Sequence, residues 1–290
     1  MAANTANIYD ASSALDLNNI RSALQRMEDS VIFGLIERSQ FKTNSGVYEP
    51  DCKQLGDFKL HQLKAAGSTG CLGDWFIYQT ECLHSQVRRY NHPTEFPFFG
   101  PLPEPSLGST SGGRTNSESI LAHVPTEAHV NSQLLDLYRR KIVPALCEEG
   151  DDSNHGSTAV QDVHVLQTMA TRIYYGLFVA ESKFRSETEK ATALIKAKDR
   201  EGLMAFITKP DVEAKNIQRV ILKARTFSQN IATGEDGQLA PVVSDTTTYK
   251  LKPEYIGEVF RDHLMPLTKE VEVNYLLHRL EAPPAKKSHM

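Results

Sequence analysis

The chain has 290 residues, of which 40% are hydrophobic and 23% charged, a composition that excludes disorder over the whole length. With 32 Lys and Arg against 36 Asp and Glu, the formal net charge is −4. Neither a basic block nor an apolar run near the ~20 residues of a membrane span occurs, so nucleic acid and membrane are excluded as main partners. Because the N-terminus lacks the basic and apolar regions of a signal peptide, we expect a cytoplasmic protein.

Helical periodicity runs through both halves of the chain. Within the first predicted helix, for example, apolar residues recur at intervals of three and four. Such patterns predict helices at 16–38, 74–89, 131–146, from 157 past 183, 189–208, 210–230 and 253–281. Asp74 is expected to cap its helix, and Pro266 to kink the last one. Since strand alternation is nowhere convincing, the predicted fold class is all-α, a single-domain bundle of about 8 to 12 helices.

Two connections are longer than a helix bundle ordinarily uses, at 40–73 and 91–130. In the second, a stretch rich in proline and phenylalanine at 91–105 is expected to form an ordered arm over a neighbouring surface. The segment 106–117 is expected to be mobile, because it consists mainly of Gly, Ser and Thr. A further polar insertion is expected at 231–251.

Searches for metal, nucleotide and covalent chemistry find no specific motif. The four cysteines match neither a CxxC pair nor a zinc ligand set, so we expect reduced thiols. The ten histidines are scattered and form no HExxH pattern. The segment 108–115 resembles a phosphate-binding loop but lacks the GK[ST] ending. We therefore expect no metal and no cofactor.

Polar residues inside otherwise apolar helices are the remaining chemical signal. Arg172 and Lys183 are 11 positions apart, which places them about 20° from eclipsed and roughly 16 Å apart along one helix. Long side chains at that spacing can converge on one anion. Two further pairs, Lys209 with Glu213 and Thr268 with Glu272, are spaced i,i+4, and Arg21 lies beside an apolar stripe. Spacing alone also permits the ordinary interpretation that these residues form solvated helix faces.

Four segments, in the same order along the chain, resemble the all-helical chorismate mutases of fungi and plants. They are LNNIRSALQRMEDSVIFGLIERSQF, HSQVRRYNHPTEFPFF, NHGSTAVQDVHVLQTMATRIYYGLFVAESKF and PLTKEVEVNYLLHRLE. The resemblance covers 13–281, which we predict to be the helical domain, with a disordered N-terminus at 1–12 and a disordered tail at 282–290. It implies isomerisation of chorismate to prephenate in Phe and Tyr biosynthesis, by a [3,3] rearrangement without cofactor or metal.

The resemblance implies six catalytic residues, Arg21, Arg172, Lys183, Glu213, Thr268 and Glu272. The two arginines would hold the two carboxylates of chorismate, and the lysine would donate to the breaking ether oxygen. Glu272 would lie at the same oxygen and would need a proton, because a carboxylate would repel the developing negative charge. Glu213 and Thr268 would hold the ring hydroxyl and the network around it. Lys209 stands where fungal members have asparagine and is left out of this set.

The resemblance also implies a homodimer that tyrosine inhibits and tryptophan activates from a cleft between subunits. The matching effector-binding residues are Arg88, Arg89, Asn154, Gly156 and Ser157. Free N–H groups at the start of a helix attract a carboxylate, and an arginine can reinforce that attraction. Val160 and Lys252 stand where the fungal relative has threonine, so loss of the amino-acid response is the alternative.

Two other functions stay open beside this one. The first is a non-catalytic helical binding module on the same scaffold, against which the joint presence of all six implied catalytic residues argues. The second is an enzyme that acts on another small dianion, which the helical spacing alone permits. An assay for chorismate disappearance distinguishes the three.

Overall fold

A computed structural model describes residues 10–106, 120–230 and 248–281. Most of the segment expected to be mobile, most of the polar insertion, residues 1–9 of the expected disordered N-terminus and all of the expected disordered tail lie outside the described residues. Helix α1 begins at Ala11 and is capped by the side chain of Asp10, two residues before the expected start of the domain. No described helix is both long and apolar enough to cross a membrane.

The described residues are helical and contain no strand beyond a single isolated bridge, which confirms the all-α prediction. The α-helices are α1 (Ala11–Ala14), α2 (Leu17–Arg38), α3 (Gly56–Ala65), α4 (Leu72–Gln86), α5 (Asn131–Leu137), α6 (Val143–Leu146), α7 (His155–Tyr174), α8 (Gly176–Ser186), α9 (Thr188–Lys196), α10 (Arg200–Ile207), α11 (Pro210–Phe227), α12 (Pro253–Glu258) and α13 (Met265–His278). The 3₁₀ segments are η1 (Ser45–Tyr48), η2 (Lys53–Leu55), η3 (Arg89–Asn91) and η4 (Thr126–Ala128), and the π-helical segments are η5 (Tyr138–Ile142) and η6 (Val259–Leu264).

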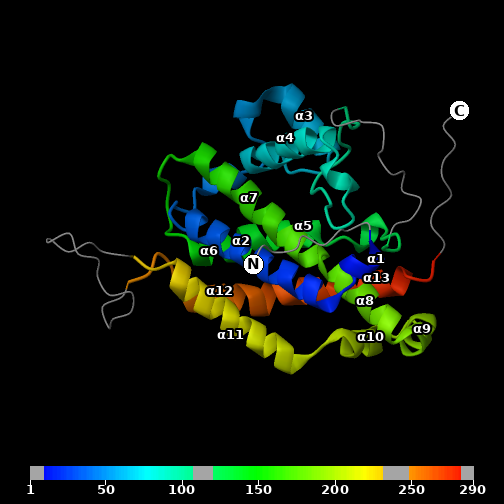
Figure 1. The fold of residues 1–290 in the computed structure, drawn as a ribbon. Helices are drawn as coiled ribbons and strands as arrows, with labels where there is room; N and C mark the ends of the chain where they lie inside the picture. The colour runs from blue at the N-terminus through cyan, green and yellow to red at the C-terminus, as the bar shows by residue number, and fades with distance from the viewer. Residues whose placement is uncertain (1–9, 107–119, 231–247, 282–290) are drawn as a thin grey trace, which may run out of the picture.

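Helix α7 lies at the centre of the fold and packs against α2, α4, α5 and α13 (Figure 1). The apolar residues in its C-terminal half are fully buried, with Val165, Leu166, Met169 and Ile173 each at most 1% exposed. Helix α2 packs tightly against α7 at Gly34, where a Cβ atom would lie 3.0 Å from Cγ2 of Val165. The apolar residues that the sequence pattern places on α7 therefore form the core, because each flanking helix packs against one side of α7.

The long helix predicted from 157 past 183 is divided in two. Helix α7 ends at Tyr174, Tyr175 forms a turn, and α8 begins at Gly176 and packs along α13. The prediction of one continuous helix was wrong by this single residue. Glycine is a weak helix former, and at this position it also permits the close approach of α8 to α13.

Helix α4 differs from its prediction at both ends. It begins at Leu72, with the Cys71 thiol accepting from the amide of Asp74 at 3.3 Å, so the cap is Cys71 and not Asp74. The carboxylate of Asp74 is instead buried and paired with Arg139 at 2.5 Å. The helix ends at Gln86, because the chain turns into a left-handed conformation at Arg88.

Both π-helical segments end two residues before a proline. Segment η5 precedes Pro144, and η6 precedes Pro266. A proline has no N–H and clashes with the carbonyl four residues earlier, and a wider turn accommodates that clash. The kink expected at Pro266 therefore takes the form of a π-helical segment.

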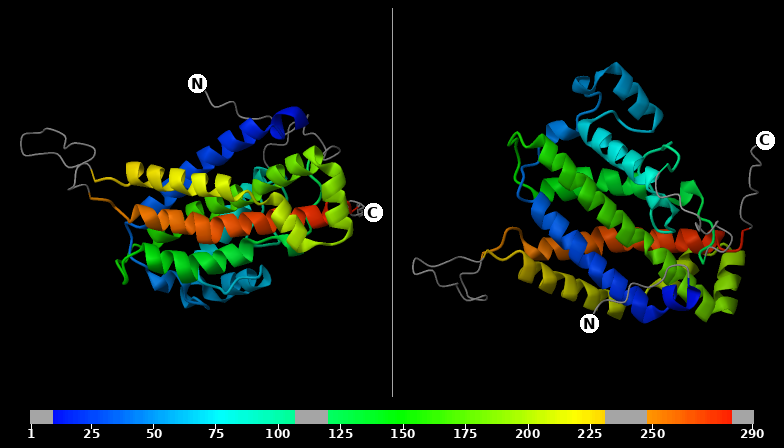
Figure 2. Two further views of the ribbon diagram at one scale, coloured as in Figure 1. Left: turned by 90° about the horizontal axis from the view of Figure 1, so that it is seen from below. Right: turned by 45° about the horizontal axis from the view of Figure 1, so that its top comes forward.

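The two long connections predicted from composition are ordered in their described parts. The first contains α3, which was missed because its periodicity is weak and only Leu63 of its residues is buried. Helices α3 and α4 form a layer on one side of α7 (Figure 2). The proline- and phenylalanine-rich arm is confirmed, since the buried Glu81 accepts from the amides of Phe98 and Phe99 at 2.7 and 3.1 Å.

Candidate active site

A cavity of about 540 Å³ lies where α2, the α7–α8 junction, α11 and α13 meet. Segments more than 200 residues apart in the sequence supply its walls. The structure brings together at this cavity all six residues implied as catalytic, Arg21, Arg172, Lys183, Glu213, Thr268 and Glu272. Apolar side chains of α2, α8 and α11 complete the lining, among them Ile20, Val179 and Val212.

Arg172 lies in the last turn of α7, and its side chain is buried at the cavity, 6% exposed. Its Nη1 atom donates to the hydroxyl of Thr268 at 3.3 Å, and its buried Nε atom has no hydrogen-bond partner in the described part of the chain. Burial lowers the pKa of this guanidinium, while the carboxylates of Glu28 and Glu272 oppose that shift. The guanidinium thus faces the cavity with N–H donors that can bind an anion.

Glu272 projects from α13 into the same cavity and is 7% exposed. Burial raises the pKa of its carboxyl to about 8; Arg172 opposes this rise and Glu213 adds to it. Below that pH the side chain carries a proton and can donate a hydrogen bond. An uncharged acid beside fixed cations is suited to an oxygen on which negative charge develops.

Thr268 and Glu213 are tied to neighbours on the cavity wall. The Thr268 hydroxyl donates to the carbonyl oxygen of Leu264 at 2.7 Å and accepts from Arg172, so its orientation is fixed. Glu213, in the first turn of α11, pairs with Lys269 of α13 at 2.8 Å. This ion pair links α11 to α13 at the cavity.

Lys183 and Lys209 form a cationic end of the cavity. Lys183 donates to the carbonyl oxygen of Phe206, and its ammonium lies 4.6 Å from the centre of the Phe206 ring. Burial, and then the charge of Lys209, lower the pKa of Lys183. Lys209 caps the start of α11 and lines the cavity, so the residue that departs from the fungal pattern belongs to the site.

Sequence reasoning missed an acidic residue on α2 and its partners on α11. Glu28 is 2% exposed and accepts from Arg219 at both oxygens, at 2.7 and 3.0 Å, and from Lys223 at 3.3 Å. Glu28 and Arg219 both line the cavity. The sequence spacing could have indicated Glu28 as a cavity residue, because Arg21, Leu24 and Glu28 are spaced i, i+3 and i+7 on one face of α2.

The charges around the cavity do not cancel. Within the residues the structure describes, Glu28 is paired with Arg219, and Glu213 with Lys269. The lining cations that form no ion pair with a described carboxylate within 4.0 Å are Arg21, Arg172, Lys183, Lys209 and Lys215. Since Glu272 is largely protonated near neutral pH, the cavity is net cationic and suited to a small anion with more than one negative charge.

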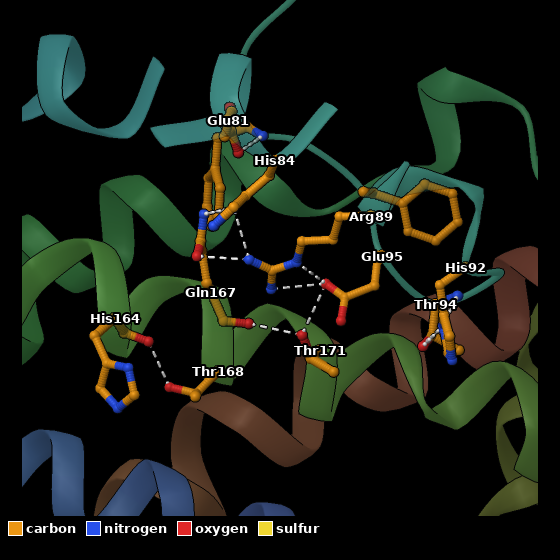
Figure 3. A network of polar contacts seen from close by, with 12 residues as sticks. Glu81, His84, Arg89, His92, Thr94, Glu95, His164, Gln167, Thr168 and Thr171 are labelled. Atoms are coloured by element: carbon orange, nitrogen blue, oxygen red, sulfur yellow. Dashed lines mark hydrogen bonds and ion pairs between the residues drawn. The ribbon is translucent and has the colours of Figure 1, made fainter. Parts of the chain in front are cut away.

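The residues implied as effector-binding lie in two separate places within one chain. Arg89 is tied to Glu95 at 2.9 and 3.1 Å and to Gln167 at 2.8 Å (Figure 3). Gln167 is ten residues beyond Ser157, or about 15 Å along α7. Asn154 occupies the N-cap position of α7, and its backbone N–H donates to the carboxylate of Asp152 at 2.9 Å. One chain therefore does not bring Arg88 and Arg89 together with Asn154, Gly156 and Ser157.

The fold and the cavity define an all-helical protein with a net cationic cavity at the meeting point of four helices. A family model described as chorismate mutase type II matches residues 155–273. A chorismate mutase of Pichia angusta is 41% identical over 93% of this chain and 89% of its own length. Among solved structures, that of the Candida albicans chorismate mutase in complex with L-Trp has a TM-score of 0.82 and 36% identity, over 96% of this chain and 97% of that one. The structure of AtCM1 with tyrosine bound in its allosteric site has a TM-score of 0.71 and 37% identity, over 94% and 99%.

The chain belongs to the chorismate mutase family, as similarity of this extent along nearly its whole length shows. The family's reaction is the isomerisation of chorismate to prephenate. Its substrate carries two carboxylates, which agrees with the charge of the cavity.

Proposed function

We propose that this cavity isomerises chorismate to prephenate and that the six residues named above carry out the reaction. The observation that carries the assignment is the burial of Glu272 near the charge of Arg172, in a cavity where most of the lining cations form no ion pair with a described carboxylate. Positioning and electrostatic complementarity are the two means of catalysis available to such a site.

The arginines bind and orient the substrate. The buried Arg172 on α7 and the exposed Arg21 on α2 both line the cavity, and each binds one of the two carboxylates of the dianion. This grip holds chorismate in the compact conformation in which the two carbons that bond are close together. Glu213, which is held in place by its ion pair with Lys269, accepts a hydrogen bond from the ring hydroxyl.

Lys183 and protonated Glu272 act at the ether oxygen. As the carbon–oxygen bond breaks, negative charge grows on this oxygen, and both side chains donate hydrogen bonds to it. The donation is stronger to the transition state than to the substrate, which is the condition for a higher kcat. An acceleration of about 10⁶-fold requires roughly 8 kcal/mol from these contacts and from positioning together.

The test is the disappearance of chorismate, followed by absorbance, with the full chain and two variants. Arg172→Ala is expected to lower kcat/KM by about 10²- to 10³-fold, because it removes a buried charged donor. Arg140→Ala is the control, since Arg140 is exposed and pairs with Asp136 one turn away. Absence of turnover in the unaltered chain would favour the binding-module alternative. Equal turnover in the Arg172 variant would overturn the assignment of the site.

We also propose that the chain forms a homodimer whose activity tyrosine and tryptophan regulate. The proposal is supported by the two similar structures bound to L-Trp and to tyrosine. It is further supported by the separation of the two sets of effector residues in one chain, because a second copy could complete the site. Sedimentation together with titration of activity by each amino acid tests both parts. A monomer, or a flat response to both amino acids, would contradict the corresponding part.

A further inference from the structure

Gly176, the first residue of α8, lies directly against two side chains of α13. A Cβ atom on Gly176 would lie 2.8 Å from Cγ2 of Thr268, 3.0 Å from Oε1 of Glu272 and 3.1 Å from Cγ of Glu272. All three atoms belong to side chains assigned to the reaction. A methyl group does not fit at these distances unless at least one of the two side chains moves.

The backbone conformation of Gly176 does not require glycine. It is the first residue of α8 and its φ is not positive, so alanine could adopt the same conformation. Alanine is also the better helix former. Glycine is therefore needed at this position because the side chains of Thr268 and Glu272 leave no room for a Cβ atom, and not because of the backbone conformation.

The neighbouring contacts show what would be displaced. Thr268 cannot retreat freely, because its hydroxyl is held both by the carbonyl of Leu264 and by Arg172. Glu272 is buried against the same wall, and its carboxyl group is the nearer of its groups to Gly176. A side chain at 176 would thus push the carboxyl toward the cavity or rotate Thr268 away from Arg172.

We propose that Gly176 is a positioning residue for the rearrangement: by lacking a side chain it lets the first turn of α8 hold Thr268 and the carboxyl of Glu272 in their reactive places. The inference rests on the proposed roles of those two residues. Gly176 itself touches no reacting atom. Its contribution is geometric, and displacement of a reactive group by about 1 Å can cost on the order of 10²-fold in rate.

The experiment measures kcat and KM for chorismate in the full chain. Gly176→Ala is expected to lower kcat by about 100-fold and to change KM far less, since the arginines that grip the substrate are not displaced. Thr268→Ser removes the closest clashing atom and keeps the hydroxyl. The double variant Gly176→Ala, Thr268→Ser is therefore expected to recover a large part of the lost kcat.

Gly34→Ala is the matched control, because it also adds a Cβ at a close helix contact, 3.0 Å from Val165, but away from the cavity. It is expected to alter thermal stability and to leave kcat within about twofold of the unaltered chain. If Gly176→Ala retained full kcat, or if the serine variant rescued nothing, the inference would be overturned.

Combination with Glu272→Ala separates this inference from the proposed function, because alanine removes both the carboxyl group and the Glu272 atoms that a Cβ at 176 would meet. If Gly176 acts on Glu272, the loss caused by Gly176→Ala becomes smaller in the Glu272→Ala background. An undiminished loss there would refute that part of the role of Gly176 and leave the role of Glu272 standing. Full activity of Glu272→Ala alone would instead overturn the proposed role of Glu272.

Discussion

The carboxyl of Glu272 and the guanidinium of Arg172 share the buried wall of one cavity and shift each other's pKa. Burial drives both groups toward their neutral forms, whereas each charge favours ionisation of the other. The balance leaves Arg172 charged and raises the pKa of Glu272 to about 8. A cation beside a neutral acid is the combination that the proposed reaction needs, and the predictions below follow from it and from the buried polar groups around α7.

Activity is expected to fall as pH rises through about 8, because Glu272 must carry its proton to donate to the ether oxygen. The group is protonated below its pKa, so kcat/KM is high on the acid side of this transition and declines on the alkaline side. Glu272→Gln, which donates at every pH, is expected to flatten the decline. The pH profiles of kcat/KM for the two proteins provide the measurement, and an unaltered profile in the variant would contradict the prediction.

Stability is expected to fall between about pH 4.5 and pH 8, partly because of Glu81. Burial raises the pKa of this carboxyl to about 8 from an ordinary value of 4.5, although two backbone amides oppose the rise. Over that window the folded chain holds a proton that the unfolded chain has released, so the free energy of unfolding decreases as pH increases. Glu81→Gln removes this contribution. Thermal unfolding at pH 5 and pH 8.5 measures it, with the variant expected to lose less stability than the unaltered chain.

Replacement of Lys209 by glutamine is expected to weaken substrate binding modestly. Lys209 is an exposed cation at the rim, so its removal costs about 1 kcal/mol or less, which is at most about fivefold in KM. The effect is expected to shrink at high salt, because exposed charges are screened. KM measured at two ionic strengths tests this, with Lys141→Gln on η5 as a control lysine away from the cavity. An equal KM for Lys209→Gln and the unaltered chain at low salt would show that Lys209 does not attract the substrate.

The buried pair of Arg38 and Asp162 is expected to be a major contributor to stability. Arg38 is fully buried and donates to Asp162 at 2.7 Å, and the hydroxyls of Tyr48 and Tyr138 both donate to the same carboxylate at 2.6 Å. Asp162→Asn leaves a buried guanidinium without its counter-charge and is expected to cost about 3–5 kcal/mol of unfolding free energy. Denaturant unfolding measures this loss. Glu254→Gln, which breaks the exposed pair with Arg225, is expected to leave the midpoint unchanged.

Much of the helical structure was determined locally. The apolar repeat of α2, the proline that starts α11 and the i,i+4 pair of Thr268 and Glu272 can be read from the sequence, because each depends on residues within a few turns. The resemblance to one family then indicated the six residues at the cavity. Local sequence patterns gave the wrong interpretation where a residue's partner lies far away in the sequence. Asp74 has the residue type of a helix cap but pairs with Arg139. Arg89, which was expected to bind an effector, contacts Glu95 and Gln167 within this chain.

Only the tertiary structure decided the chemical environment of the cavity. That α2, α8, α11 and α13 meet, that Glu28 faces Arg219, and that Gly176 lies against Glu272 are relations between distant segments. The pKa of Glu272 depends on the same relations, since it is set by how completely other helices exclude water and by which charges they bring near. Sequence spacing fixes which face of a helix a side chain occupies, whereas desolvation and charge come from what packs against that face.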